Sequence, residues 1–151
     1  MFHTRLSVRG FTLLELMVVI AIISILASFT APTLTRQITK AKLIEAQNIA
    51  TQQQSLVEEF ILLNGRFPTQ SQLDGISQPL NTGSVVKEIT INNANATAGD
   101  IKLSLDDSIS NTEGPHLTYS RGENRNWQCT SNLAANVLPE QCDSATAGTQ
   151  G

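Results

Sequence analysis

Few side chains in this sequence could support enzymatic chemistry. The chain has two histidines, His3 and His116, and two cysteines, Cys129 and Cys142. Two cysteines do not complete a zinc site, and a catalytic thiol would need a histidine beside it. The sequence contains no glycine-rich phosphate loop and no Gly-x-Ser-x-Gly nucleophile motif. We therefore expect no enzymatic activity, no cofactor and no resident metal.

Acidic side chains offer one alternative, a calcium site. Asp106 and Asp107 are adjacent, so in a strand their side chains point to opposite faces and cannot act jointly. With Asp100 or Glu113 they could surround Ca²⁺, but their spacing follows no recognisable calcium-binding motif. We expect a solvated turn at these carboxylates instead.

One further carboxylate, Glu15, lies where a charge is unfavourable. Of the fifteen residues from Leu13 to Ala27, thirteen are apolar, and no charged residue occurs from Leu16 to Thr35. A helix needs about 20 mostly apolar residues to cross a bilayer, and a carboxylate within it costs about 2.5–3.5 kcal/mol. Glu15 therefore needs an opposite charge, or it must reach the lipid headgroups.

The residues around Glu15 resemble a known processing motif. Arg5 and Arg9 form a basic start without acidic residues, and the run GFTLLE follows from Gly10 to Glu15. This run resembles the type IV prepilin motif, which type II secretion pseudopilins share. The resemblance implies that a prepilin peptidase cuts between Gly10 and Phe11 and methylates the Phe11 amine. It also implies that Glu15 pairs with the N-terminal amine of a neighbouring subunit, a contact that makes its burial tolerable.

An ordinary signal peptide is the alternative for this N-terminus. A cut after Ile25–Leu26–Ala27 would discard the apolar run and release a soluble binding module that begins near Ser28. Glu15 would then lie inside the apolar part of the signal, without a reason for its charge. We favour the prepilin interpretation, in which the apolar run is retained.

The resemblance divides the chain into four parts. Residues 1–10 are a cleaved leader, 11–31 a membrane and polymerisation helix, 32–65 the amphipathic half of that helix, and 66–151 the remaining domain. Pro32 lacks an N–H and predicts a kink, because helical patterning resumes directly after it. A second possibility is that Pro32 ends the membrane helix.

The amphipathic half predicts the surface that packs on the rest of the domain. One helical face carries Ala46, Ile49, Leu56, Phe60 and Leu63, with Gln53 interrupting it. The opposite face carries polar side chains, including Glu58. The helix is expected to end at Asn64–Gly65, where glycine can adopt the left-handed cap conformation. The polar side chains of the opposite face are expected to meet solvent.

Beyond the helix the pattern predicts an α+β fold with an antiparallel sheet of about four strands. Residues 66–83 contain several prolines and glycines and predict a loop. The small polar residues 92–99 predict a second loop. The expected strands are Val85–Ile91, Ile101–Leu105, Leu117–Ser120 and Asn126–Thr130.

The C-terminal region carries both cysteines. An even number of cysteines in a chain that leaves the cytoplasm suggests one disulfide, with two buried thiols as the alternative. Trp127–Gln128–Cys129, followed by Leu138–Pro139 before Cys142, resembles the disulfide-bounded region of type IVa pilins. The resemblance implies a Cys129–Cys142 bridge, and we expect Trp127 in the core beside it.

These features together predict a major type IVa pilin. The resemblance implies a single-pass inner-membrane precursor that assembly machinery polymerises into an extracellular pilus. Adhesion, twitching motility and DNA uptake are the family's filament functions, with a host surface or DNA as possible partners. The net charge of −3 becomes −5 once Arg5 and Arg9 are removed, so the bulk surface attracts nucleic acid little. A minor pilin and a type II secretion pseudopilin are the alternatives within this group.

Overall fold

The structure, a computed structural model, describes residues 10–145, except the side chains of residues 30–33. Apart from Gly10, the predicted leader with Arg5 and Arg9 lies outside the described residues. The chain forms two compact units, with the boundary between Thr35 and Arg36.

The longest element is the helix α1, Leu13–Asn64, with 52 residues. It begins directly after Thr12 and ends before Gly65, whose φ of +70° lies in the left-handed region that glycine adopts easily. The Gly65 amide donates to the carbonyl of Ile61 over 2.8 Å, which satisfies one of the last carbonyls of the helix. The predicted helix end at Asn64–Gly65 is confirmed.

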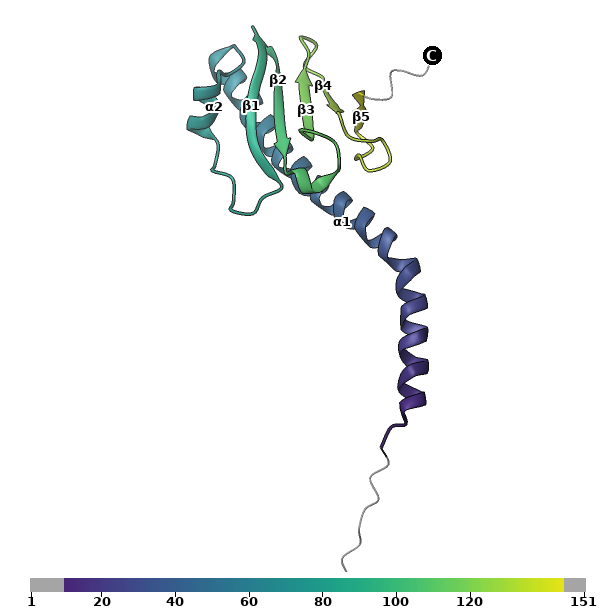
Figure 1. Ribbon diagram of the computed structural model, residues 1–151. Coiled ribbons are helices and arrows are strands. Elements are labelled where there is room, and N and C mark those ends of the chain that lie inside the picture. Colours follow the sequence, from purple (N-terminus) through teal and green to yellow (C-terminus); the bar gives the residue numbers. More distant parts are fainter. Residues whose placement is uncertain (1–9, 146–151) are drawn as a thin grey trace, which may run out of the picture. The chain divides into compact units, whose positions relative to one another are not determined.

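From Leu43 onward, α1 packs on one face of a β-sheet (Figure 1). Its buried residues recur every three or four positions, which is the spacing of one helical face. They are Leu43, Ala46, Ala50, Gln53, Val57 and Ile61.

The predicted apolar face of α1 is confirmed at Ala46, which is 0% exposed, but the rest of it is rotated away from the buried stripe. Ile49, Leu56 and Phe60 are only partly buried, and Leu63 is 77% exposed. The buried stripe instead passes through Gln53, which was expected only as an interruption. Its burial is tolerable because the Ser77 hydroxyl donates to Gln53 Oε1 over 2.8 Å.

The sheet has five strands in the order β1-β2-β3-β4-β5. The first four pair antiparallel, as predicted, whereas β5 runs parallel to β4. The prediction of about four strands missed β5 because it has only three residues, too few for an alternating pattern. The strands are β1 (Val86–Asn95), β2 (Ala98–Leu105), β3 (His116–Arg121), β4 (Trp127–Ser131) and β5 (Cys142–Ser144).

Two predicted loops contain regular structure. Within residues 66–83 lies the short helix α2, Gln70–Ile76, which begins with a capping box between Thr69 and Gln72. The expected loop at residues 92–99 is mostly strand, because β1 and β2 meet in a tight hairpin at their ends. Local composition misled both predictions, since polar residues and glycines also occupy short helices and exposed strand edges.

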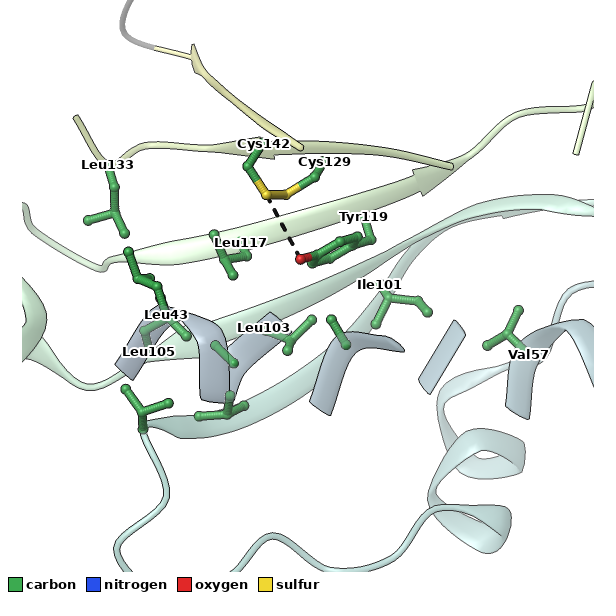
Figure 2. Close-up of a cluster of buried hydrophobic side chains, with 14 of the residues drawn as sticks. Leu43, Val57, Ile101, Leu103, Leu105, Leu117, Tyr119, Cys129, Leu133 and Cys142 are labelled. Carbon is green, nitrogen blue, oxygen red and sulfur yellow. Dashed lines mark hydrogen bonds between the residues drawn. A yellow bond between two sulfur atoms is a disulfide. The ribbon is translucent and has the colours of Figure 1, made fainter. Parts of the chain in front are cut away.

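The core lies between α1 and the inner face of the sheet (Figure 2). Leu43 of α1 and Leu103 and Leu117 of the sheet are 0% exposed. The predicted disulfide joins Cys129 of β4 to Cys142 of β5, with their Cα atoms 4.5 Å apart. It covers one side of this core and thereby fixes β5 to the sheet.

Aromatic side chains complete this core. The Tyr119 hydroxyl lies 3.9 Å from Cys142 Sγ, and burial raises the pKa of Tyr119. Trp127 is only partly buried rather than enclosed beside the disulfide. Its ring packs near that of Phe67, with the two ring centroids 6.4 Å apart. The prediction for Trp127 therefore holds for its place against the core but not for full burial.

Candidate subunit-assembly surface

The first unit presents an apolar surface on α1. Every leucine, isoleucine, valine, methionine and phenylalanine from Leu13 to Phe29 is at least 50% exposed. Exposed apolar patches of more than a few hundred Å² mark interaction sites in soluble proteins. An apolar partner, either lipid or protein, is therefore needed to cover this segment.

A helix cap fixes the glutamate at the start of this surface. The Thr12 backbone amide and hydroxyl donate to Glu15 Oε2 over 3.0 and 3.1 Å. In return, the Glu15 amide donates to Thr12 Oγ1 over 3.2 Å. This reciprocal arrangement is a capping box, in which the first free N–H groups of a helix find acceptors. The carboxylate is thus held by its own helix.

The capping role of Thr12 was not predicted, although the sequence carries a signal for it. A threonine followed three residues later by a glutamate, just before an apolar run, is the sequence pattern of a capping box. Thr12 precedes α1 and Glu15 lies in its first turn, as that pattern requires. The same motif that resembles a processing site therefore also starts the helix.

The predicted cleavage site precedes this cap. Gly10 and Phe11 lie outside regular secondary structure, and Phe11 is 94% exposed. No described heavy atom lies within 4 Å of the place where a side chain on Gly10 would begin. The link between them is accessible from solvent, so its cleavage stays a prediction that this geometry permits. The side chain of Pro32 lies outside the described residues, and its kink also stays a prediction.

The membrane segment can be judged only from length and composition. Among the described residues, no single helix is both long and apolar enough to cross a bilayer. A bent pair, Leu13–Phe29 with Leu34–Asn64, meets both conditions.

In the second unit, a buried arginine ties α1 to the sheet. Arg121 of β3 is 4% exposed, and its Nε and Nη2 donate to the two carboxylate oxygens of Glu58 over 2.6 and 3.1 Å. The Trp127 indole N–H donates to Glu58 Oε1 over 2.9 Å. The hydrogen bond from Arg121 lowers the pKa of Glu58, which partial burial opposes. Glu58 therefore faces the sheet, and its predicted place on a solvent-facing side of the helix is wrong.

The sequence matches a known protein family over most of its length. Residues 39–143 match the family described as "Pilin (bacterial filament)". A type IV major pilin protein of Neisseria gonorrhoeae is 34% identical over 126 residues, which cover 80% of this chain and 74% of that protein. The chain belongs to the type IV pilin family. Residues 5–31 of this pilin also match the prokaryotic N-terminal methylation motif, which includes Gly10, Phe11 and Glu15.

Other relatives place this pilin among filament proteins. The fimbrial protein EcpC of Eikenella corrodens is 32% identical over 146 residues, covering 93% of the pilin and 94% of that protein. The type II secretion system core protein G of Klebsiella michiganensis is 43% identical over 68 residues, covering 45% of the pilin and 48% of that protein. The pilin family is structural rather than enzymatic.

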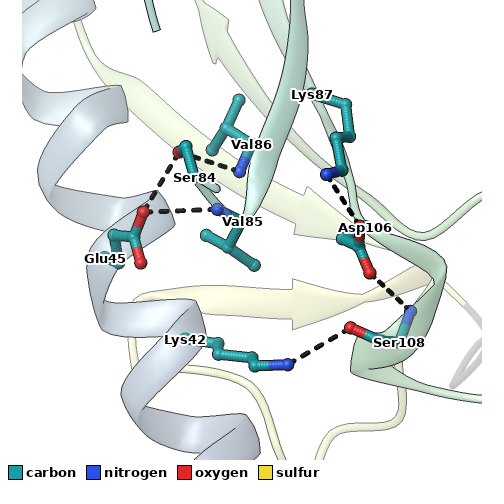
Figure 3. A network of polar contacts seen from close by, with 8 residues as sticks. All are labelled: Lys42, Glu45, Ser84, Val85, Val86, Lys87, Asp106 and Ser108. Carbon is teal, nitrogen blue, oxygen red and sulfur yellow. Dashed lines mark hydrogen bonds and ion pairs between the residues drawn. The ribbon is translucent and has the colours of Figure 1, made fainter. Parts of the chain in front are cut away.

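A second polar network fixes the pilin's helix near the start of β1 (Figure 3). Glu45 Oε1 accepts from the Ser84 hydroxyl over 3.0 Å and from the Val85 amide over 3.3 Å. On the same part of α1, Lys42 Nζ donates to Ser108 Oγ over 3.2 Å. These bonds join α1 to the segment before β1 and to the 3₁₀ helix Asp107–Ile109, whereas the contact at Glu58 joins it to the sheet.

The carboxylates considered for calcium are used differently. Asp106 pairs with Lys87 Nζ over 2.8 Å and accepts from the Ser108 amide over 2.9 Å (Figure 3). The bond from Lys87 holds the pKa of Asp106 well below its usual range. Asp106 also caps the 3₁₀ helix Asp107–Ile109, so the expected turn is a short helix start. Asp100 Oδ2 instead accepts from the side-chain nitrogen Nδ2 of Asn93 over 2.6 Å.

Proposed function

We propose that this pilin is the major subunit of a type IV pilus. The exposed apolar surface from Leu13 to Phe29 is the observation that carries the proposal. A folded domain with a retained apolar helix can reside in a membrane alone and in a filament core when neighbours supply the same surface. The relatives named as major pilins and fimbrial proteins support this assignment.

Maturation would begin at the accessible link between Gly10 and Phe11. A prepilin peptidase removes residues 1–10, and Phe11 then carries a methylated amine. The retained helix at residues 11–31 holds the subunit in the inner membrane as a single-pass protein, with the domain beyond it outside the cytoplasm. The pilus assembly machinery then moves the subunit from lipid into the filament, with a kink at Pro32 adapting the helix to both places.

Glu15 would give the filament its register. Before assembly, the capping box with Thr12 satisfies the carboxylate within one chain. In the filament, the methylated amine at Phe11 of a neighbour offers it an opposite charge. Because lipid and protein surroundings are similarly apolar, burial of apolar side chains contributes little preference, and this charge pair supplies specificity.

Removal of the Glu15 carboxylate tests this role. In a Glu15→Ala strain, the leader is still cut and the cellular pilin level stays at the wild-type value. Sheared filaments fall more than about tenfold, because the neighbour's buried amine loses its partner. Glu59→Ala, an exposed acid on the domain part of α1, serves as the matched control and leaves filaments unchanged. Wild-type filament yield from the Glu15→Ala strain would refute the pairing.

The filament's use in the cell is a finer proposal. We infer adhesion, twitching motility or DNA uptake, with a host surface or DNA as the external partner. A minor pilin or a type II secretion pseudopilin remains the alternative, favoured by the similarity to core protein G. Quantifying the subunit in sheared surface filaments separates a major pilin from these two alternatives. A major pilin dominates that fraction, whereas a minor pilin or a pseudopilin does not.

A further inference from the structure

The two edges of the sheet differ in length. The edge strand β5 has three residues and is attached to β4 through the disulfide at Cys142. The opposite edge, β1, has ten residues and pairs with β2 on one side only. A long edge offers backbone N–H and C=O groups to any further strand, so folded proteins cover or blunt such edges.

One glutamine side chain covers the middle of the β1 edge. Gln70 lies in α2, which runs beside β1 at that edge of the sheet (Figure 1). The Ile91 amide donates to Gln70 Oε1 over 2.7 Å, and Gln70 Nε2 donates to the Ile89 carbonyl over 3.0 Å. These two backbone groups lie two residues apart on the same side of β1. A single residue of a strand added parallel to β1 would form the same pair of bonds.

Two neighbours in α2 hold this amide in place. Asp74, one turn further along the helix, accepts from Gln70 Nε2 over 2.8 Å and so keeps the nitrogen toward the Ile89 carbonyl. Leu73 is 1% exposed and anchors the helix in the core. The capping box at Thr69 starts the helix directly before Gln70. The amide is therefore positioned rather than free to rotate into solvent.

The strand beneath this amide has a sequence suited to self-pairing. Residues 86–91 read VKEITI, in which the charges of Lys87 and Glu88 cancel and four of six residues are β-branched. Short segments with high β-propensity, low net charge and no proline pair readily with identical segments. Both charged side chains are exposed, so they do not block the edge by pointing inward. A second copy of the same strand is thus the natural occupant of an open β1 edge.

We propose that Gln70 occupies the hydrogen-bonding place of an added strand and thereby prevents a second copy of this chain from pairing along β1. Subunits that gather in a membrane or along a filament bring many identical edges close together. Pairing along β1 would compete with the association of their apolar helices. By covering the β1 edge, the short helix α2 therefore leaves the apolar surface of α1 as the place of self-association.

Self-association of the full-length protein in detergent tests the proposal. In Gln70→Ala, sedimentation velocity shows oligomers that grow with protein concentration beyond those of the wild type. At the lowest concentration, the Ile91 amide exchanges with deuterium about tenfold faster, because its acceptor is gone. Amides of the central strand β3 keep their wild-type exchange. Gln78→Ala, which removes an exposed glutamine just beyond α2, is the matched control and changes neither measurement.

A second variant separates edge pairing from general unfolding. Glu88→Lys in the Gln70→Ala background gives residues 86–91 two positive charges, so two copies that pair along β1 repel each other. We expect the double variant to sediment like the wild type while the fast exchange at Ile91 persists. The proposal would be overturned if the double variant formed oligomers of the same size and amount as Gln70→Ala. It would also be overturned if Gln70→Ala itself sedimented like the wild type.

Discussion

The two parts of α1 use apolar side chains in different ways. From Leu13 to Phe29 the large apolar side chains are all at least half exposed. From Arg36 onward a single stripe is buried against the sheet, and Leu43, Ala46 and Val57 are 0% exposed. In the second part the partners of the helix belong to the same chain, so its buried residues form one periodic stripe.

This difference teaches how one helix can serve two purposes. A stripe is sufficient where a single surface, the sheet, covers the helix. Apolar residues all around the axis are needed where lipid or several neighbours surround it. The first part therefore presents the surface that we propose for assembly, and the second part stabilises the domain. Changes of the same kind in the two parts should have separate consequences.

The largest expected effect comes from matched leucines in the two parts. Leu43→Ala removes a side chain that is 0% exposed and should lower the free energy of unfolding by about 3 kcal/mol. Leu14→Ala removes one that is 73% exposed and should change it by less than about 0.5 kcal/mol, while filament yield falls. Urea unfolding, followed by the fluorescence of Trp127, the single tryptophan, measures the stability of both variants. The amount of pilin in sheared filaments measures filament yield. Equal destabilisation by the two variants would end the division of α1 into two roles.

A loss of stability of similar size is expected when the disulfide, which lies wholly in the second unit, is removed. Cys129→Ser combined with Cys142→Ser opens a loop whose ends are 13 residues apart. Chain-entropy estimates give a loss of about 3 kcal/mol, or a fall in Tm of about 10 °C. Thermal unfolding followed by circular dichroism measures the shift. An unchanged Tm would show that the core holds β5 without the bridge.

A smaller effect is expected at Glu58, where the stability of the second unit depends on pH. The folded-state pKa of Glu58 lies below its unfolded value, so the folded protein binds fewer protons there. The resulting stability is complete above the unfolded pKa, near 4.5, and is lost as pH falls through the folded value. Glu58→Gln should lower stability at neutral pH by about 1–2 kcal/mol, a limited loss because water reaches this carboxylate.

The variant also has a distinct pH profile. Wild type and Glu58→Gln should converge as the pH falls, because protonated Glu58 and glutamine leave Arg121 equally without an anion. Asp106 has a lowered pKa as well, and it contributes equally to both proteins. Urea unfolding at a series of pH values measures the difference. A constant gap across the acid range would contradict the assignment of this pH dependence to Glu58.

Much of the fold followed from local patterns. The long helix, its end at Gly65 and the first four strands were predicted from composition, alternation and spacing, and the resemblance to type IVa pilins implied the disulfide. The rotation of the buried helical face was not, because Ile49 and Leu56 are as apolar as the residues that are buried. Glu58 was assigned to the opposite face because local pattern sorts side chains by polarity alone. A polar side chain can face the core when a partner distant in sequence, here Ser77 or Arg121, satisfies it.

For the site, sequence alone predicted that a type IV pilin retains an apolar segment with a single carboxylate. That conclusion needed no long-range contact, because the charge, the apolar run and the processing motif are neighbours in the chain. Tertiary structure alone decided that Arg121 is buried on Glu58 and that Gln70 lies along the β1 edge. Each of those contacts joins residues separated by about 20 or more positions. Their hydrogen bonds depend on how the chain folds back on itself, which no local pattern encodes.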